Sequence, residues 1–249
     1  MEADLKRLYD FSYNIVAADC NAQREVSVPI LANRILDVAT RHADLWGIGY
    51  ENITHNNQAW VLARLAIEME HYPNPYDTLI VETWVEDFNR HFSSRNFCFR
   101  DPEGNIYGYA RSIWFVIDLI TRKSLDISAF EYLKDRKYPK ECPIATQGRL
   151  RPVTEGKGYD YDVVYSDIDF NRHFNSGKQI EHVLNHFPLE QFDQKRVKRF
   201  EINYMNEAHF GDKLEIISRE DESDKYTVEV HHKDGTNLIC RCKIVFEDR

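Results

Sequence analysis

The stretch LANRILDVATRHADLWGIG, residues 31–49, carries the clearest secondary-structure signal in this chain of 249 residues. Its apolar residues Leu31, Ile35 and Val38 recur at helical spacing and predict one amphipathic helix. The pattern stops at Gly47, and glycine ends a helix at low energetic cost. The apolar face of such a helix needs a partner, so the neighbouring segments must supply a sheet or a second helix.

Four segments with alternating apolar residues follow this helix, at residues 61–69, 79–85, 95–100 and 106–118. A period of two residues is typical of strands that are buried on one face. The last two segments are joined by Asp101-Pro102-Glu103-Gly104, a turn with proline early and glycine late. The first half of the chain is therefore predicted to be a helix followed by an antiparallel meander.

The second half repeats this order of elements. A helix is predicted from about Asn175 to Phe187, where Pro188 ends it. Alternating segments follow it at residues 200–204, 214–218, 226–230 and 238–246. The chain therefore contains the same unit twice.

Short sequence matches support a duplication. Tyr76-Asp77-Thr78-Leu79 corresponds to Gly211-Asp212-Lys213-Leu214, and Ala110-Arg111-Ser112 corresponds to Cys240-Arg241-Cys242. Between the halves, residues 132–158 show neither period, so we place a linker there with a boundary near residue 148. The prediction is α+β: a domain at residues 1–148 and a domain at 149–249, each an antiparallel sheet wrapped around a helix.

The net charge of −9 argues against a general nucleic-acid-binding protein, which needs a broad basic surface. Positive charge is concentrated only locally, in the run Lys195, Arg196, Lys198 and Arg199. This run could dock an acidic partner, or it could be a set of ordinary solvated charges beside a strand.

The cysteines and the apolar segments indicate the compartment. The five cysteines form an odd set without Cys-x-x-Cys spacing, which predicts neither a disulfide framework nor a zinc site. The longest strongly apolar run, Ile113 to Ile120, is interrupted by Asp118. We therefore expect a cytoplasmic protein that does not bind membranes.

The segment SDIDFNRHFN, residues 166–175, places acid, amide and imidazole groups directly before the second predicted helix. The first amides of that helix could stabilise an oxyanion formed at a carbonyl group. The alternative is structural: Asp169, Asn171 and Asn175 would be turn and capping residues, and His173 would form only a local hydrogen bond. In the first half, the corresponding place is predicted at Glu25 to Leu31, which has no such cluster.

Two further sets of residues are candidate sites. Glu207 follows the strand that ends at Tyr204. Its carboxylate could lie beside the N-terminus of the second helix, or it could be a solvated loop residue. His182 and His186 stand four residues apart, but no cysteine or Glu-x-x-His partner lies at ligand spacing. No metal and no cofactor are predicted.

Residues 166–175 resemble the Ser-Asp-x-Asp-x-Asn-x-His-x-Asn motif of the acyl-acyl carrier protein (acyl-ACP) thioesterase family. Val81-Glu82-Thr83-Trp84-Val85 and Ala110-Arg111-Ser112-Ile113-Trp114 resemble strands of that family's first domain. The resemblance covers nearly the whole chain and implies two tandem hotdog domains. It also implies hydrolysis of a fatty acyl-ACP to a free fatty acid, as in fatty acid biosynthesis, without a cofactor.

Carried over to this sequence, the family's active-site residues are Asp169, Asn171, His173 and Glu207. Ala208 stands where many members have a cysteine, so water must be the nucleophile, directly or after attack by a carboxylate. We hypothesise that Glu207 activates the water while Asp169 and His173 orient it, with the choice between Asp169 and Glu207 as base or nucleophile left open. Burial would raise the pKa values of the carboxylates, and Asn171 and the helix N-terminus would polarise the carbonyl.

The resemblance also implies partners and rival functions. An acyl carrier protein is the expected partner, docked at Lys195 to Arg199, and a homodimer fits the same family. Trp46, Trp60, Leu62 and Trp84 are candidates for the lining of an acyl tunnel, although core packing is the default interpretation for each of them. An acyl-CoA thioesterase, a hydroxyacyl dehydratase and a non-catalytic acyl-binding module remain as alternatives, since the fold alone does not choose among them.

Overall fold

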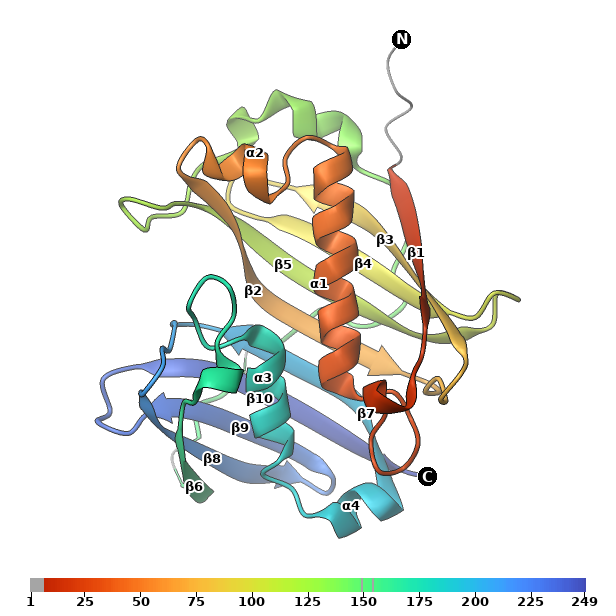
Figure 1. Cartoon of the computed structure of the whole chain (residues 1–249), viewed down its shortest axis with the longest axis vertical. Helices are drawn as coiled ribbons and strands as arrows, with labels where there is room; N and C mark the ends of the chain where they lie inside the picture. Colours follow the sequence, from red (N-terminus) through yellow and green to blue (C-terminus); the bar gives the residue numbers. More distant parts are fainter. Residues whose placement is uncertain (1–6, 149, 154) are drawn as a thin grey trace.

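The computed structural model describes residues 7–148, 150–153 and 155–249, and the strands of this part form one ten-stranded antiparallel sheet. From edge to edge the order is β1-β3-β4-β5-β2-β7-β10-β9-β8-β6 (Figure 1). The strands are β1 (Leu8–Asn14), β2 (Gln58–Met69), β3 (Thr78–Phe88), β4 (Ser93–Arg100), β5 (Ile106–Asp118), β6 (Lys157–Asp162), β7 (Lys195–Tyr204), β8 (Lys213–Glu222), β9 (Lys225–His232) and β10 (Leu238–Asp248).

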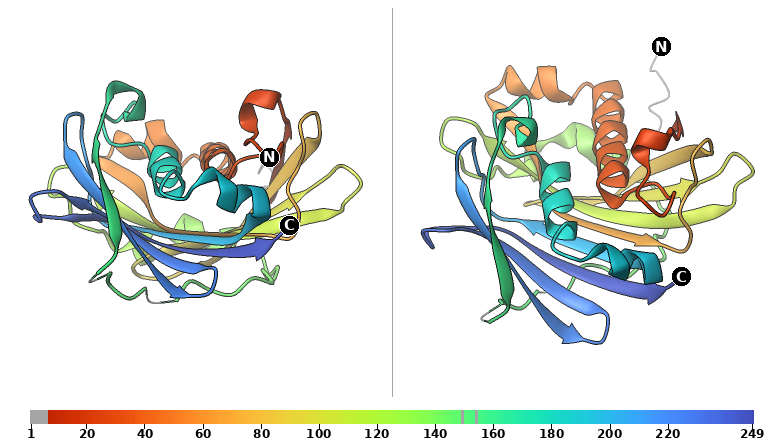
Figure 2. Two further views of the ribbon diagram at one scale, coloured as in Figure 1. Left: turned by 90° about the horizontal axis from the view of Figure 1, so that it is seen from below. Right: turned by 60° about the horizontal axis from the view of Figure 1, so that its bottom comes forward.

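The helices lie on the concave face of this curved sheet (Figure 2). The α-helices are α1 (Val28–Leu45), α2 (Tyr50–Thr54), α3 (Ser176–Leu184) and α4 (Leu189–Gln194). The 3₁₀ helices are η1 (Ala17–Asp19), η2 (Ile127–Ala129), η3 (Glu131–Arg136) and η4 (Tyr165–Asp167). No helix of the described residues is long and apolar enough to cross a membrane.

The strand order shows that the sheet consists of two equivalent halves. Read inwards from the two edges, β1-β3-β4-β5-β2 matches β6-β8-β9-β10-β7. The halves meet where β2 pairs with β7 in antiparallel fashion, from Arg64 opposite Asn203 to Glu68 opposite Arg199. The predicted α+β architecture of two tandem units is confirmed, and their two sheets are continuous.

Helices α1 and α3 lie side by side and run in opposite directions (Figure 1). Gly177 permits this close approach, since a Cβ atom there would lie 2.4 Å from the Asn33 side-chain oxygen. The core side of α1 is fully buried at Leu31, Ile35 and Val38, as its periodicity predicted. Each long helix therefore has its apolar face on its own half of the sheet and touches the other helix.

The sequence prediction missed the two edge strands. β1 and β6 are short, and β6 begins inside the segment that was predicted to be linker. The second helix ends at Leu184 instead of Phe187, because the chain turns after Asn185 and α4 begins after Pro188. The eight other strands and the first helix are confirmed.

The chain between η3 and β6 crosses the convex face of the sheet, opposite the helices (Figure 2). Arg111 of β5 donates to the carbonyl of Ile144 at 2.9 Å. The Gln147 amide donates to the carbonyls of Leu65 in β2 and Ile202 in β7, at 2.9 and 3.1 Å. This segment, which contains the predicted domain boundary, therefore fastens the two central strands together.

A buried ion cluster also joins the halves. Arg199 of β7 contacts Glu68 of β2 and Glu201 of β7, at 2.6 Å each, and donates to the carbonyl of Ala145 at 2.8 Å. Its side chain is 11% exposed. Removing one partner from a buried cluster leaves uncompensated charge, which is strongly destabilising.

We expect Arg199→Met to lower the free energy of unfolding by about 3 kcal/mol, since the buried Glu201 and the partly exposed Glu68 would lose their cation. Denaturant unfolding measures this change. Lys225→Met is the matched control, because Lys225 pairs with Glu222 at the surface and its loss should cost less than about 1 kcal/mol. Equal losses in the two variants would contradict a structural role for Arg199.

Candidate active site

The loop between η4 and α3 presents Asn171 and His173. The Asp169 carboxylate accepts the backbone amides of both residues, at 2.8 and 3.1 Å, and Arg172 between them has a φ of 65°. The backbone N–H of Asp169 also donates to the His173 carbonyl at 2.9 Å. These bonds fix a tight turn, so the predicted role of Asp169 as a turn residue is confirmed.

Asp167 anchors this loop to the domain. Its buried carboxylate accepts from the Tyr161 hydroxyl at 2.5 Å and from the Val164 amide at 2.9 Å, and it lies 3.1 Å from His182 Nε2. Burial alone would raise the pKa of Asp167, but these hydrogen bonds outweigh it and lower the pKa below its ordinary value. His182 therefore supports the loop as a partner of Asp167.

Asn175 caps α3, as its position predicted. Its side-chain oxygen accepts the amides of Gly177 at 2.8 Å and Lys178 at 3.2 Å. These two helix amides are therefore occupied and cannot bind a ligand oxygen. Within the described part of the chain, the Ser176 amide has no acceptor, so it is the amide of this first turn that remains for an oxyanion.

Glu207 lies on the loop after β7 and faces His173, with 3.6 Å between Glu207 Oε2 and His173 Nε2. The Glu207 side chain is 41% exposed, so the burial that was expected for this carboxylate is not found. Its other oxygen accepts a hydrogen bond from Arg122 of the first half. The structure thus brings Asp169, Asn171, His173 and Glu207 together and adds Arg122, which sequence reasoning missed.

The turn after β5 presents Arg122. The Asp118 carboxylate accepts the amides of Ile120 at 3.1 Å and Thr121 at 2.6 Å, and the Arg122 amide donates to the Asp118 carbonyl at 2.8 Å. Arg122 itself has a φ of 58°. The sequence around Arg122 does not predict its contact with Glu207, because Glu207 is 85 residues away in the other half.

These residues lie at a cavity of about 940 Å³ that both halves line. Its apolar wall comes from the later part of α1 and from β2, including Leu36, Ala39, Trp46, Trp60 and Leu62. Trp84 does not line it: it packs in a separate buried cluster with Cys98 and Cys142, which is the default interpretation for this residue. A cavity of this size and polarity fits an apolar small-molecule chain.

A buried cation interrupts the apolar wall. Arg95 lines the cavity, contacts His42 Nδ1 at 2.8 Å and lies over the Trp46 ring at 5.5 Å. Its burial lowers the pKa of Arg95 to about 9, so the side chain is still charged at neutral pH. The lining is therefore polar at this point.

One group near Glu207 has the composition of a metal site. Ligand atoms of His173, Glu207 and His209 lie within 4.8 Å of one another. The Arg122 guanidinium on Glu207 opposes a second cation there, since like charges repel. We therefore assign the group no metal.

The predicted docking cations lie elsewhere. Lys195 pairs with Asp224, Arg196 with Glu247, Lys198 with Glu70, and Arg199 belongs to the buried cluster. β7 runs from these residues toward Glu207, and its length places Lys195 about 30 Å from the candidate site. The structure does not bring this run to the other predicted residues.

The equivalent turn in the first half is not the one predicted. Asn21 accepts the amides of Gln23 at 3.1 Å and Glu25 at 3.0 Å, and Arg24 between them has a φ of 65°. This is the geometry of the Asp169 turn. The prediction that Glu25 to Leu31 is the corresponding segment was therefore wrong, because the matching turn lies earlier, at Asn21 to Glu25, and it carries polar residues.

Family models for the N-terminal and C-terminal domains of acyl-ACP thioesterases match residues 6–133 and 150–248. The chain belongs to the acyl-ACP thioesterase family. The family's description thus agrees with the resemblance that the motif at residues 166–175 carries.

Solved structures of acyl-ACP thioesterases resemble this protein along nearly its whole chain. The crystal structure of an acyl-ACP thioesterase from Bacteroides thetaiotaomicron has a TM-score of 0.89 and 34% identity, covering 98% of this chain and 100% of that one. The 12:0-ACP thioesterase from Umbellularia californica has a TM-score of 0.84 and 19% identity, covering 97% and 98%, which supports the fold alone.

A plant relative, the chloroplastic palmitoyl-acyl carrier protein thioesterase of Arabidopsis thaliana, is 24% identical over 79% of this chain. That alignment covers 51% of the relative's length. This chain therefore spans about half the length of the curated relative.

We expect Asp167→Asn to lower the free energy of unfolding at neutral pH by about 2 kcal/mol, because the charge-assisted hydrogen bonds to Tyr161 and His182 weaken. The pKa of Asp167 is lowered in the folded state, so its contribution is present above the ordinary pKa and is lost as pH falls through the folded value. Urea unfolding across the acid range should show the two proteins converging at low pH. A difference independent of pH would contradict this.

Proposed function

We propose that the protein hydrolyses the thioester of a fatty acyl-ACP and releases a free fatty acid and the carrier thiol. The supporting observation is the convergence of Asn171, His173 and Glu207 at a cavity that both halves line. Family membership supports the same reaction. A carrier in the cytoplasm is the proposed context.

Glu207 is the proposed general base, with Asp169 as a positioning residue. One oxygen of Asp169 is engaged by two loop amides, and Asn21 makes the same bonds in the equivalent turn with an uncharged amide. The turn therefore needs an oxygen acceptor and no negative charge at that position. Glu207 has an oxygen directed at His173, where one water could contact both groups.

The reaction balances as follows. A water molecule attacks the thioester carbonyl while Glu207 accepts its proton, and a C–O bond forms. The side-chain amide of Asn171 and the backbone amide of Ser176 donate to the oxyanion. The C–S bond then breaks, and the sulfur takes the proton that Glu207 accepted from the water, so that a carboxylic acid and a thiol leave and Glu207 is again a carboxylate. His173 orients the water and Glu207.

The proposed partner is an acyl carrier protein. The cations Lys195, Arg196, Lys198 and Arg199 are each paired with carboxylates, which reduces the attraction they offer to an acidic partner. Near Glu207 the surface instead exposes Phe170 and Ile120, which are 80% and 75% accessible. Docking beside these two residues would place the thioester at the cavity, whereas docking at the run would place it far away.

The first test is thiol release by the purified protein from acyl-ACP and acyl-CoA substrates. Glu207→Gln should lower turnover by about a hundredfold or more, which is the usual effect of losing a general base. Asp169→Asn should cost less, because asparagine makes this turn in the first half. A larger loss for Asp169→Asn would reverse the two roles.

His173→Ala is the control for the location of the site, since its imidazole faces Glu207. Release that survives this variant would contradict the assignment. Faster release from acyl-CoA than from acyl-ACP would favour the acyl-CoA thioesterase, and binding without release would leave an acyl-binding module.

Arg122→Gln should lower kcat about tenfold with little change in KM, because Glu207 loses the hydrogen bond that orients it. Arg122→Lys keeps the charge and should recover part of the loss. Arg90→Gln is the matched control, since Arg90 pairs with Asp126 in an exposed ion pair of the same half. A rise in KM alone would show that Arg122 binds substrate and does not position Glu207.

A further inference from the structure

The molecule has a second cavity. It is related to the first by the rotation that superposes one half of the sheet on the other across the pairing of β2 with β7. This second cavity has a volume of about 800 Å³. It lies between the first turns of α1 and the length of α3 from Gly177 to Leu184, whereas the candidate active site lies between the first turn of α3 and the later part of α1. The arrangement follows because the two helices run in opposite directions (Figure 1).

Backbone hydrogen bonds establish which residues correspond. The Phe174 amide donates to the Ala208 carbonyl at 2.7 Å, and the Val26 amide donates to the Pro73 carbonyl at 2.9 Å. Glu25 therefore occupies the position of His173. The residue before Pro73, Tyr72, occupies the position of Glu207.

The second cavity lacks the chemistry of the first. Glu25 is held by Arg249 through two contacts, at 2.7 and 3.1 Å. The Tyr72 hydroxyl donates to the Val197 carbonyl at 2.7 Å, and burial raises its pKa well above the ordinary value. Arg249 engages both carboxylate oxygens of Glu25, whereas Arg122 engages only one oxygen of Glu207 and leaves the other for water. Glu25 and Tyr72 therefore have no free basic atom for water, and this cavity is suited to binding without hydrolysis.

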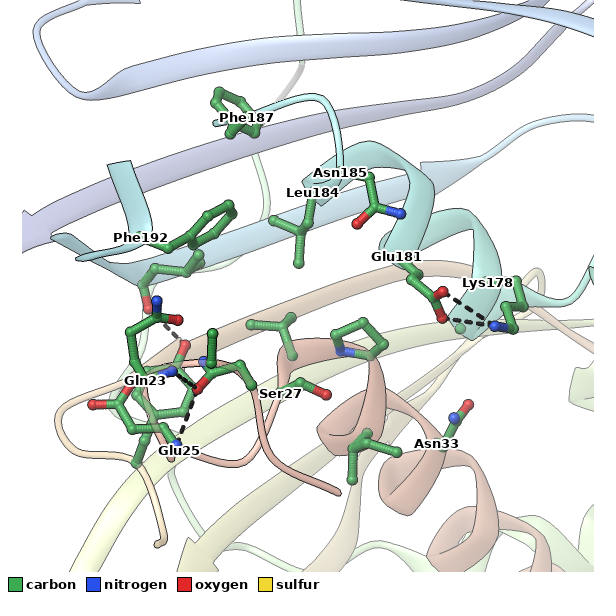
Figure 3. A pocket seen from close by; sticks show the side chains of 18 of the residues that line it. Gln23, Glu25, Ser27, Asn33, Lys178, Glu181, Leu184, Asn185, Phe187 and Phe192 are labelled. Atoms are coloured by element: carbon green, nitrogen blue, oxygen red, sulfur yellow. Dashed lines mark hydrogen bonds and ion pairs between the residues drawn. The ribbon is translucent and has the colours of Figure 1, made fainter. Parts of the chain in front are cut away.

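One wall of the second cavity is apolar. Leu184, Phe187 and Phe192 lie together on one side of it, across from Gln23 and Glu25 (Figure 3). Leu184 is the ninth residue after the N-cap Asn175, as Leu36 is the ninth after the N-cap Ser27 in the first cavity. Each cavity therefore has a leucine at the equivalent helix position in its apolar wall.

The charge of the lining favours an anion. Lys178, Arg196 and Arg249 outnumber Glu25 and Glu181 among the residues that line this cavity, and Glu247, the partner of Arg196, does not line it. Lys178 pairs with Glu181 (Figure 3), and Arg249 pairs with Glu25.

Arg196 is the cation with spare donors. Its Nε donates to Glu247 at 2.8 Å, and its two terminal nitrogens form no hydrogen bond with any residue that the structure describes. A guanidinium edge of this kind binds carboxylates through charge-assisted hydrogen bonds.

We propose that this second cavity binds a free fatty acid, with the carboxylate at Arg196 and the chain against Leu184, Phe187 and Phe192. The choice of a fatty acid rests in part on the proposed function, since the first cavity is its acyl site. The second cavity would then be a non-catalytic site that binds the product of the reaction.

Titration calorimetry with dodecanoate, below its micelle concentration, tests the proposal on the full chain. The wild type should bind two equivalents. Leu184→Trp should fill the second cavity and abolish one equivalent, and the matched variant Leu36→Trp should fill the first cavity and abolish the other. Binding that neither Leu184→Trp nor Arg196→Gln changes would overturn the proposal.

Arg196→Gln keeps the side chain polar and avoids the packing change of a tryptophan. It should weaken the affinity of the second cavity for dodecanoate by about tenfold, which corresponds to the loss of one charge-assisted hydrogen bond. Thermal unfolding of each variant controls for folding.

Thiol release separates this proposal from the proposed function. Leu184→Trp should retain hydrolysis and Leu36→Trp should lose it. If neither the wild type nor any variant hydrolyses a thioester, the proposed function fails. The loss of one bound dodecanoate in Leu184→Trp would still support the second site. One bound equivalent that disappears only in Leu36→Trp contradicts it.

Discussion

The antiparallel pairing of β2 with β7 determines the rest of the architecture. Five residue pairs, from Arg64 with Asn203 to Glu68 with Arg199, join two sheets into one. An antiparallel pair of equivalent strands relates its two sides by a rotation, so the helices on those sides must run in opposite directions. The start of each helix then faces the later part of the other, which produces two related cavities.

Much of the fold could be predicted because its segments carry strong periods. The alternation over residues 106–118 gave β5 with its observed bounds. The edge strands β1 and β6 were missed although tyrosines alternate with polar residues in β6, because a short strand among charged residues gives a weak signal. Edge positions also leave one side of the strand without a partner, so less apolar sequence is required there.

The candidate site was predictable where it is local and unpredictable where it spans the halves. Asp169, Asn171 and His173 lie in one short segment whose residue types are unusual together. Arg122 reaches Glu207 across 85 residues, and only the folded sheet brings them into contact. The turn at Asn21 shows a further limit: sequence comparison misplaced it, because the two turns share hydrogen bonds and an arginine at positive φ but differ at Asn21 and Asp169 and at Glu25 and His173.

The fusion of the two units has an evolutionary consequence. In a symmetric homodimer of such a unit, every substitution appears in both crevices, so a residue selected for chemistry in one is imposed on the other. Here each position is encoded separately. His173 and Glu25 occupy matching places, and so do Glu207 and Tyr72, with different side chains in each pair. A substitution in one crevice therefore leaves the other unchanged, as with two gene copies after duplication.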